Sequence, residues 1–418
     1  MAAVVAVVLT ACGSSNDNSG GSSSGGSSTT SASTGSSSGA TSTSGGSSSS
    51  SSDKSPIKIG AVIDETGLMK PTDEPALYGA QLEMKKINSQ GGVDGRKLEM
   101  TVANDQLQPS LTRSDALKAS QSSDILWVTC DVDFATPSIQ VGLQAKKLTI
   151  SPCIGTDQMG PKRFGSQGAM AFSYGNVAQD EGAADAQIAK KQGWKTAVVV
   201  TDKQIVYNEN VCSAFAQKFA ALGGKVVDQQ TWTQGDHTIG DVAGQVGKDK
   251  ADVIMVCTTA APDVSTLLSD VRSVGNNTPF LAPWSLDGTY WMPKSPKIST
   301  NFWTDSYSSV YGDAPNPAIR KLIKQLSAEG HAPVTGGFVA GSAAIDGIVA
   351  AVKQSGGSTD GAKLAAAMQK FKNLPTISGP VSFSSQVHTV SGRPYRVLEV
   401  TDRKGHYKYT IDSQGKVS

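Results

Sequence analysis

Short apolar runs alternate with segments of helical periodicity along the first part of this chain. Residues 57–63 (IKIGAVI) form an apolar run of strand length, and residues 75–88 place Ala76, Ala80, Met84 and Ile87 on one helical face. The same alternation then predicts a strand at 98–102, a helix at 111–119, and strands at 125–129 and 148–150. Repeated strand and helix units of this length predict right-handed crossovers and a mostly parallel sheet covered by helices on both faces.

The alternation starts afresh after this first group of elements. It predicts helices at 179–192, 209–222 and 264–274, and strands at 197–201, 225–228, 253–257 and 280–282. A second doubly wound sheet follows from this pattern. Residues 307–311 and 338–353 lie too far along the chain to extend it simply, so we expect a return to the first lobe there and a further crossing near residues 379–383.

Chain length also favours two lobes, because the part after residue 55 has about 360 residues, more than one core usually organises. The predicted fold class is therefore α/β with two Rossmann-like, doubly wound lobes. We assign residues 56–173 and 308–383 to lobe 1, and residues 174–307 and 384–418 to lobe 2.

The N-terminal segment has a different character. An apolar run ends in Leu9-Thr10-Ala11-Cys12, which has the form of a bacterial lipobox. Residues 1–12 are interpreted as a shortened signal peptide and lipobox, since the usual basic opening is missing, and Cys12 as the lipidated first residue of the mature chain. Residues 13–55 are almost entirely Ser, Gly and Thr, which bury too little apolar surface to offset the entropy of ordering, so a disordered tether is expected.

Composition and motifs exclude several classes of function. Lys plus Arg number 37 against 36 for Asp plus Glu, so no net field draws the chain to nucleic acid. The 4 histidines are scattered and no C-x-x-C motif occurs, which argues against a metal or thiol redox site. There is no P-loop, no G-x-G-x-x-G after a strand and no nucleophile near a base, so neither an enzyme nor a cofactor is predicted.

The cysteines after Cys12 are even in number, as expected for a chain exported to an oxidising compartment. Three pairings are possible for four cysteines. We predict Cys130–Cys153, which follow consecutive parallel strands, and Cys212–Cys257, which join a helix to a strand end within one lobe.

One stretch carries a family likeness. GAQLEMKKINSQGGVDGRKLEMTVANDQLQP (79–109) closely resembles the opening of the branched-chain amino-acid binding proteins of ABC importers, which have the type I periplasmic-binding fold. In that family a helix ends in Ile-Asn, a Gly-Gly-Val/Ile-x-Gly-Arg turn follows, and the next strand leads to an acid and a proline. Here these are Ile87-Asn88, residues 91–96, Asp105 and Pro109, and the segments TISPC, KTAVVVTDKQIVYNEN and DVRSVGNNTPFLAPWS resemble later landmarks in the same order.

The resemblance implies two lobes joined by three crossover strands that close on a small solute. Together with the lipobox, it predicts a monomeric, extracytoplasmic solute-binding lipoprotein that delivers a small polar organic solute, such as an amino acid or a relative, to an ABC permease. Such a protein would be anchored at the extracellular face of the membrane, the periplasmic side in a Gram-negative cell. The alternative is a sensor that reports the solute to a membrane receptor or kinase.

Candidate site residues follow the strand ends, because ligands of open α/β sheets bind beyond the carboxyl ends of the strands. In lobe 1 these are Asp131, Gly155 and Thr156. The resemblance implies that their loops supply hydroxyls and backbone N–H groups to a ligand carboxylate. Asp131 stands where the family offers a serine and would repel a carboxylate, unless this loop of different length is shifted by one or two residues. Gly155 and Thr156 are therefore the better contacts.

In lobe 2, Tyr207 falls where the family usually has a cleft tyrosine, or else it packs at a helix start. The family's acid for the ligand ammonium follows a proline, but here Trp284 follows Pro283 and Asp287 is the nearest acid. Either Asp287 pairs with an ammonium, or the solute lacks one and stacks on Trp284. Thr258 and Thr259 follow the strand at 253–257, and each either donates a hydrogen bond to the solute or caps the next helix.

The lipobox interpretation predicts that Cys12→Ser, in a chain with a complete signal peptide, is released from the membrane or left uncleaved. Membrane fractionation and the mass of the mature protein measure this outcome. A Cys12→Ser protein that is still processed and still sediments with membranes contradicts lipidation at Cys12.

Overall fold

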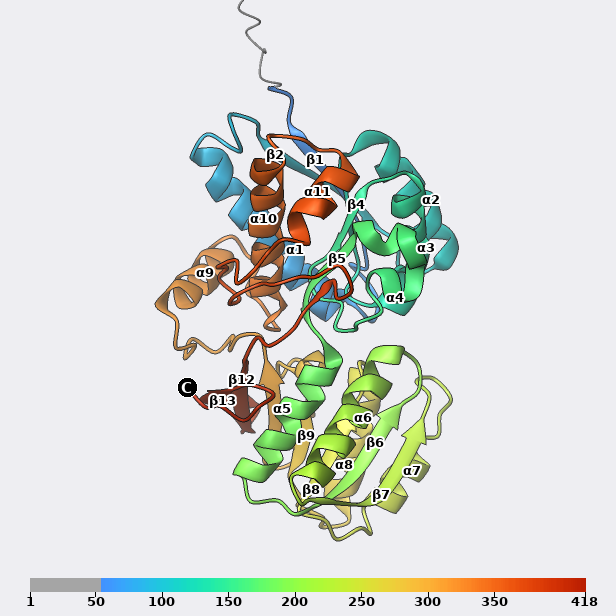
Figure 1. Ribbon diagram of the computed structural model, residues 1–418. Helices are drawn as coiled ribbons and strands as arrows, with labels where there is room; N and C mark the ends of the chain where they lie inside the picture. The colour runs from blue at the N-terminus through green and yellow to red at the C-terminus, as the bar shows by residue number, and fades with distance from the viewer. Residues whose placement is uncertain (1–53) are drawn as a thin grey trace, which may run out of the picture. The chain divides into compact units, whose positions relative to one another are not determined.

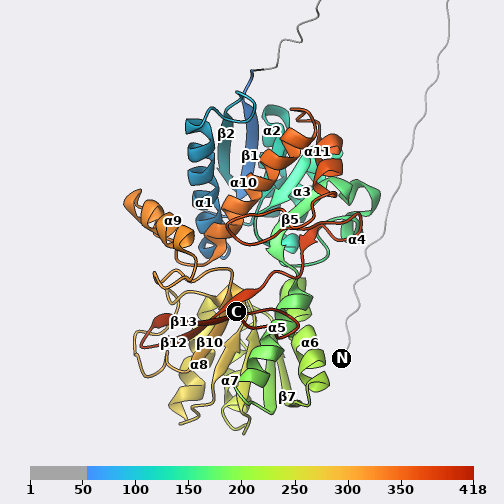
Figure 2. The same cartoon turned by 60° about the vertical axis from the view of Figure 1, so that its left-hand side comes forward.

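The computed structural model describes residues 54–418, so Cys12 and nearly all of the expected tether lie outside the described residues. Within 54–418 the strands form one six-stranded sheet and one seven-stranded sheet. Helices cover the sheets, as Figures 1 and 2 show. The α/β class with two doubly wound lobes is confirmed.

The first sheet is entirely parallel, with the strand order β11-β5-β4-β3-β1-β2. Its central strands are buried along their whole length, as a parallel sheet with helices on both faces requires. The strands are β1 (Ile57–Ile63), β2 (Leu98–Asn104), β3 (Ile125–Val128), β4 (Leu148–Ser151), β5 (Ala171–Asn176) and β11 (Thr389–Val390).

Two layers of helices cover the first sheet. Side chains of α1 (Lys70–Ser89), α10 (Gly337–Gln354) and α11 (Gly361–Met368) share an apolar cluster with one face of β1. Val62, on the opposite face of β1, packs with α2 (Pro109–Ser122) and α3 (Val132–Gln144). Alternate residues of β1 thus pack against helices on opposite faces of the sheet, because successive side chains of a strand point to opposite faces.

The second sheet has the order β13-β12-β10-β9-β8-β6-β7 and is parallel except where β12 pairs with β10 and β13. Helices α5 (Ala178–Lys191) and α6 (Val206–Ala221) cover one face, and α7 (Ile239–Val246) and α8 (Ala261–Ser273) cover the other. The strands are β6 (Thr196–Asp202), β7 (Lys225–Trp232), β8 (Val253–Cys257), β9 (Phe280–Ala282), β10 (Phe302–Ser306), β12 (Tyr395–Thr401) and β13 (Lys404–Ile411).

The chain passes between the sheets three times, after β5, after β10 and after β11. The expectation of a crossing near residues 379–383 is wrong, because β11 still pairs with β5 of the first sheet. Gly379, at φ 118°, instead makes a local turn that brings Leu374 and Val381 into an antiparallel bridge. Residues 389–390 of the range assigned to lobe 2 therefore belong to the first sheet.

Several elements escaped the sequence pattern. Helix α3 contains Pro137 and Gly142, both unfavourable in helices, and the pattern gave no helix there. The helices α4 (Pro161–Phe164), α7, α9 (Pro317–Ala328) and α11 and the strands β5, β10, β12 and β13 were not predicted either. Among the described residues, no helix combines the length and the apolar character needed to cross a membrane.

Both disulfides expected from the sequence are present. Cys130 and Cys153 follow the neighbouring strands β3 and β4, with their Cα atoms 4.8 Å apart. Cys212 of α6 and Cys257 at the end of β8 have Cα atoms 5.8 Å apart. Each bridge stays within one lobe, so neither disulfide prevents the lobes from moving against each other.

Helices α1 and α10 touch through their backbones. A Cβ atom on Gly79 would lie 2.1 Å from the Phe338 carbonyl oxygen, and one on Gly341 would lie 1.8 Å from the Ala76 carbonyl oxygen. The Ser342 hydroxyl donates to the Gly79 carbonyl oxygen at 2.9 Å. Only glycine permits this approach, which fixes α10 against α1.

We predict that Gly341→Ala lowers the free energy of unfolding by at least about 1–3 kcal/mol, because the added methyl overlaps a backbone atom of α1. Gly244→Ala is the matched control, since a Cβ atom on this helical glycine of α7 would have no neighbouring atom within 4 Å, and alanine there should stabilise by up to about 1 kcal/mol. Denaturant unfolding followed by circular dichroism measures both. Equal effects would contradict the close helix contact.

Candidate functional site

A narrow cleft lies where residues from the carboxyl ends of both sheets meet. Its free volume is about 10 Å³, room for about one water molecule. Residues following β3 and β4 line one side, and residues following β6, β8 and β9 line the other. The lining residues are Met69, Thr72, Cys130, Asp131, Cys153, Gly155, Ile205, Tyr207, Thr259, Trp284 and Ser285.

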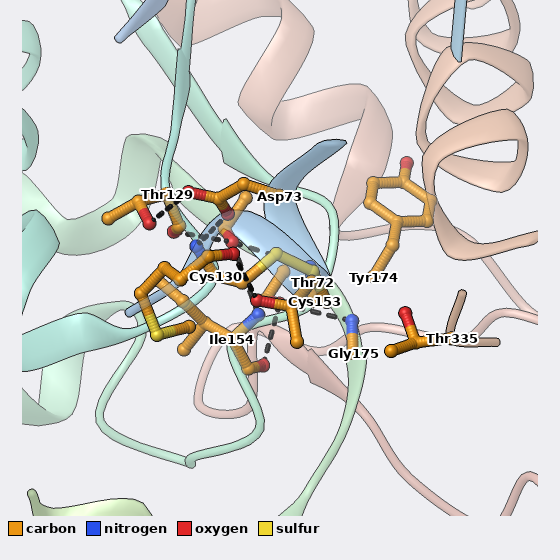
Figure 3. The surroundings of a disulfide bond; sticks show 12 residues. Thr72, Asp73, Thr129, Cys130, Cys153, Ile154, Tyr174, Gly175 and Thr335 are labelled. Atoms are coloured by element: carbon orange, nitrogen blue, oxygen red, sulfur yellow. Dashed lines mark hydrogen bonds between the residues drawn. A yellow bond between two sulfur atoms is a disulfide. The ribbon is translucent and has the colours of Figure 1, made fainter. Parts of the chain in front are cut away.

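A buried carboxyl group of α1 fixes the first side of the cleft. Asp73 accepts hydrogen bonds from the Thr129 hydroxyl at 2.5 Å, the Cys130 N–H at 2.9 Å and the Asp64 N–H at 3.0 Å. Burial raises the pKa of Asp73 to about 8. Figure 3 shows how these bonds tie the start of α1 to the end of β3 beside the Cys130–Cys153 disulfide.

Asp131 is the N-cap of α3. Its Oδ1 accepts from the Asp133 N–H at 2.8 Å and from the Phe134 N–H at 3.1 Å. Burial raises the pKa of this carboxyl to about 7. Serine and aspartate are both favoured N-caps. An aspartate can therefore replace the serine that is found at this position in the family that the sequence resembles. The cap is also the signal by which sequence inspection would have found α3.

Gly155 and Tyr207 face each other across the cleft. A Cβ atom on Gly155 would lie 2.7 Å from Tyr207 Cε2, so the tyrosine ring packs directly on the backbone of the opposite lobe. Thr156 is fully buried and does not line the cleft. Its hydroxyl accepts from Asn210 Nδ2 at 3.3 Å, and its carbonyl oxygen accepts from the Thr389 hydroxyl at 2.7 Å.

Two further predicted residues lie behind the cleft wall. The Thr258 hydroxyl donates to Asp202 Oδ2 at 2.7 Å and accepts from the Ala260 N–H at 2.8 Å, so it holds the loop before α8. Asp287 accepts from the Gly336 N–H at 2.8 Å and from the Ser306 hydroxyl. Burial raises the pKa of Asp287 to about 7. Neither residue lines the cleft, whereas the neighbours Thr259 and Trp284 do.

Trp284 lines the second side of the cleft. It opens a short 3₁₀ turn (Trp284–Leu286) and stacks on Tyr307 with ring centroids 4.5 Å apart. Its backbone N–H donates to Glu181 Oε1 at 2.9 Å. The buried indole N–H has no hydrogen-bond partner among residues 54–418.

Glu181 of α5 was missed by the sequence reasoning. Its Oε2 accepts from the Tyr207 hydroxyl at 2.9 Å, so this one carboxyl group holds both aromatic walls of the cleft. Asp185, one turn later, and Asp305 of β10 lie with it, and all three are fully buried. The signal was an acid pair four residues apart on the apolar face of a helix.

Burial raises the pKa of Glu181 to about 8 and the pKa values of Asp185 and Asp305 well above their ordinary range. The negative charge of Glu181 adds to this rise for Asp185 and Asp305, because neighbouring carboxylates repel one another, so the cluster retains protons. Within the described part of the chain, no group of three or more His, Cys, Asp or Glu side chains could hold a metal ion.

Comparisons with known proteins place the chain among solute-binding proteins. Residues 56–406 match the periplasmic binding protein family. The Leu/Ile/Val-binding protein BraC3 of Rhizobium johnstonii is 22% identical over 330 residues, covering 78% of this chain and 87% of that protein.

Solved structures show the same fold. LivJ of Streptococcus pneumoniae, in complex with isoleucine, has a TM-score of 0.74 at 17% identity and covers 85% of this chain and 99% of its own. A solute-binding protein of Rhodopseudomonas palustris, in complex with 3,4-dihydroxybenzoic acid, has a TM-score of 0.73 at 17% identity, covering 86% of this chain and 98% of its own.

The raised pKa values predict that stability falls as the pH rises. Below about pH 4, Glu181 is protonated in the folded and unfolded states, and its contribution is fully present. The contribution of Glu181 to the free energy of unfolding is then lost as the pH rises through about 8. The loss is about 1.4 kcal/mol per pH unit for each proton that the folded state retains and the unfolded state has released. Thermal unfolding of the wild type between pH 5 and 9 should show this decline.

Glu181→Gln should flatten the decline, although it should lower stability at pH 5, because the amide replaces one acceptor oxygen by a donor. Glu99→Gln, at an exposed position of β2, should keep the wild-type slope. Identical slopes for wild type and Glu181→Gln would contradict a protonated cluster at this place.

Proposed function

Because this chain belongs to the periplasmic binding protein family, we propose that it captures a small polar organic solute between its two lobes for an ABC importer. The single observation that carries the proposal is the two-sided cleft. Cys130, Cys153 and Gly155 reach it from the first lobe, and Tyr207 and Trp284 reach it from the second. A solute that touches both sides binds the closed state better and shifts the population towards it.

The chemistry of the lining supports a solute with an apolar or aromatic body and a few polar groups. Aromatic rings and a disulfide supply apolar surface, while Thr72, Thr259 and Ser285 supply hydroxyl groups. Amino acids and aromatic acids both have this character, and relatives bound to isoleucine and to 3,4-dihydroxybenzoic acid support both classes.

Of the residues expected from the sequence, we propose Asp131, Gly155, Tyr207 and Trp284 as the parts of the chain that meet the solute. Thr156, Thr258 and Asp287 then hold the surrounding loops, since their polar atoms bond to the protein. Stacking on Trp284 is therefore favoured over pairing of an ammonium with Asp287.

We propose further that the protein performs no chemistry, acts as a monomer and passes its solute to a membrane permease. Cys12 would carry a lipid anchor at the extracellular face of the membrane, and residues 13–55 would tether the lobes to it. These proposals are supported by the lipobox, by the Ser/Gly-rich composition and by family membership.

Two measurements test the proposal. Native mass spectrometry of the purified protein, followed by mass spectrometry of the released small molecules, should identify a solute at about one per chain. Protein with no retained solute, and with no heat of binding to L-isoleucine, L-leucine, benzoate or 3,4-dihydroxybenzoate, would contradict the proposed class.

Variants of the cleft then locate the site. Trp284→Ala and Tyr207→Ala should each weaken calorimetric binding of the identified solute by about 2 kcal/mol or more, as expected for buried aromatic contacts. Trp194→Ala, a partly buried tryptophan of the second lobe outside the cleft, should bind like wild type, and Asp287→Asn should have a smaller effect than Trp284→Ala. The reverse order for Asp287 and Trp284 would contradict the stacking assignment.

A further inference from the structure

Helix α6 has no N-terminal cap of its own. Its N-cap residue, Ile205, offers no side-chain hydrogen bond to the first turn. The Val206 N–H donates instead to Asp133 Oδ2 at 2.9 Å, and Asp133 belongs to α3 of the opposite lobe. A carboxylate at this place is favoured both by the free N–H group and by the positive end of the helix dipole.

Asp133 is held in position for this bond. Its other oxygen, Oδ1, accepts from Arg163 Nη1 at 2.7 Å, and Arg163 also donates to Gln158 Oε1 at 3.1 Å. Arg163 and Gln158 lie in the same lobe as Asp133, so the carboxylate is oriented from its own side. Asp133 is partly exposed, with 29% of its side chain accessible, so a change there does not open the core.

The first two turns of α6 make further contacts with the first lobe. The Val206 side chain packs against the apolar cluster of α3 and the loop after β4, which includes Val132, Ile154 and Met159. One turn later, Asn210 Nδ2 donates to the Thr156 hydroxyl at 3.3 Å. Between them, the Tyr207 ring lies on Gly155. The cap is thus one of several contacts between the start of α6 and the first lobe.

We infer that Asp133 is a positioning residue, which caps helix α6 from the opposite lobe, sets Tyr207 against Gly155 and holds the lobes closed without the help of a solute. The cleft in this closed arrangement has a free volume of only about 10 Å³, far less than a small organic solute needs. The cap then sets the fraction of molecules that are open to an incoming solute, which scales the apparent affinity of the site proposed above.

The test measures the distance between the lobes in protein freed of solute by unfolding and refolding with the disulfides intact. Probes are placed by Leu117→Cys and Val274→Cys, exposed positions on the first and second lobes. Pulsed spin-label spectroscopy should show a short-distance population in the otherwise unchanged protein. Asp133→Ala should lower the ratio of closed to open molecules about fivefold, the factor that loss of one helix N-cap usually gives.

For Asp133→Asn, the ratio of closed to open molecules should lie between those of the wild type and Asp133→Ala. The amide oxygen still accepts from the Val206 N–H, but the side chain no longer has the negative charge that pairs with Arg163. Asp360→Ala is the matched control, since Asp360 caps α11 within one lobe by accepting from the Lys363 N–H at 2.9 Å. It should lower the melting temperature and leave the distance distribution unchanged.

Three results would each overturn the inference: a solute-free protein with only the long distance, an Asp133→Ala distribution like that of wild type, or an equal shift in Asp360→Ala. No solute is present in this experiment. Its failure is therefore separate from a failure of the proposed function, which the binding measurements test.

Discussion

The cleft depends on one buried carboxyl group. Glu181 accepts hydrogen bonds from the Tyr207 hydroxyl and from the Trp284 backbone N–H, and it lies against Asp305. The two hydrogen-bond donors come from α6 and from the turn after β9, so a single group on α5 sets the relative positions of these two elements. In this buried environment an unpaired charge is costly, and the raised pKa values of Glu181, Asp185 and Asp305 reduce that cost because the acids retain protons.

The rest of the site follows from the sheets. The carboxyl ends of parallel strands lie at one edge of the sheet. The loops that follow them can bring polar groups together there while the backbone of the strands stays paired in the core. On the first lobe Asp73 and Asp131 use buried carboxyl groups to fix the loops after β3, and the Cys130–Cys153 disulfide joins two neighbouring strand ends. On the second lobe Glu181 fixes Tyr207 and the backbone of Trp284 by hydrogen bonds. Buried carboxyl groups thus fix the residues that line the cleft on both lobes.

The sequence predicted the fold well because its signals are local. The strands at 57–63, 253–257 and 280–282 match the structure residue for residue, and the disulfide pairs follow from strand ends. Strand ends and the family resemblance together pointed to Gly155, Tyr207 and Trp284, and all three line the cleft. It could not find Glu181, whose role depends on partners 26 and 103 residues away. The two-residue strand β11 was equally invisible, since only its pairing with β5 defines it.

The central claim is that Tyr207 and Trp284, held by Glu181, close on the solute against Gly155 of the opposite lobe. A crystal structure of the protein with its co-purified solute tests this most directly. The account predicts electron density for the solute between the Trp284 ring and the loop of Gly155, with both Glu181 hydrogen bonds retained behind it. Density elsewhere, or a solute paired with Asp287 while Trp284 points away from it, would contradict the account.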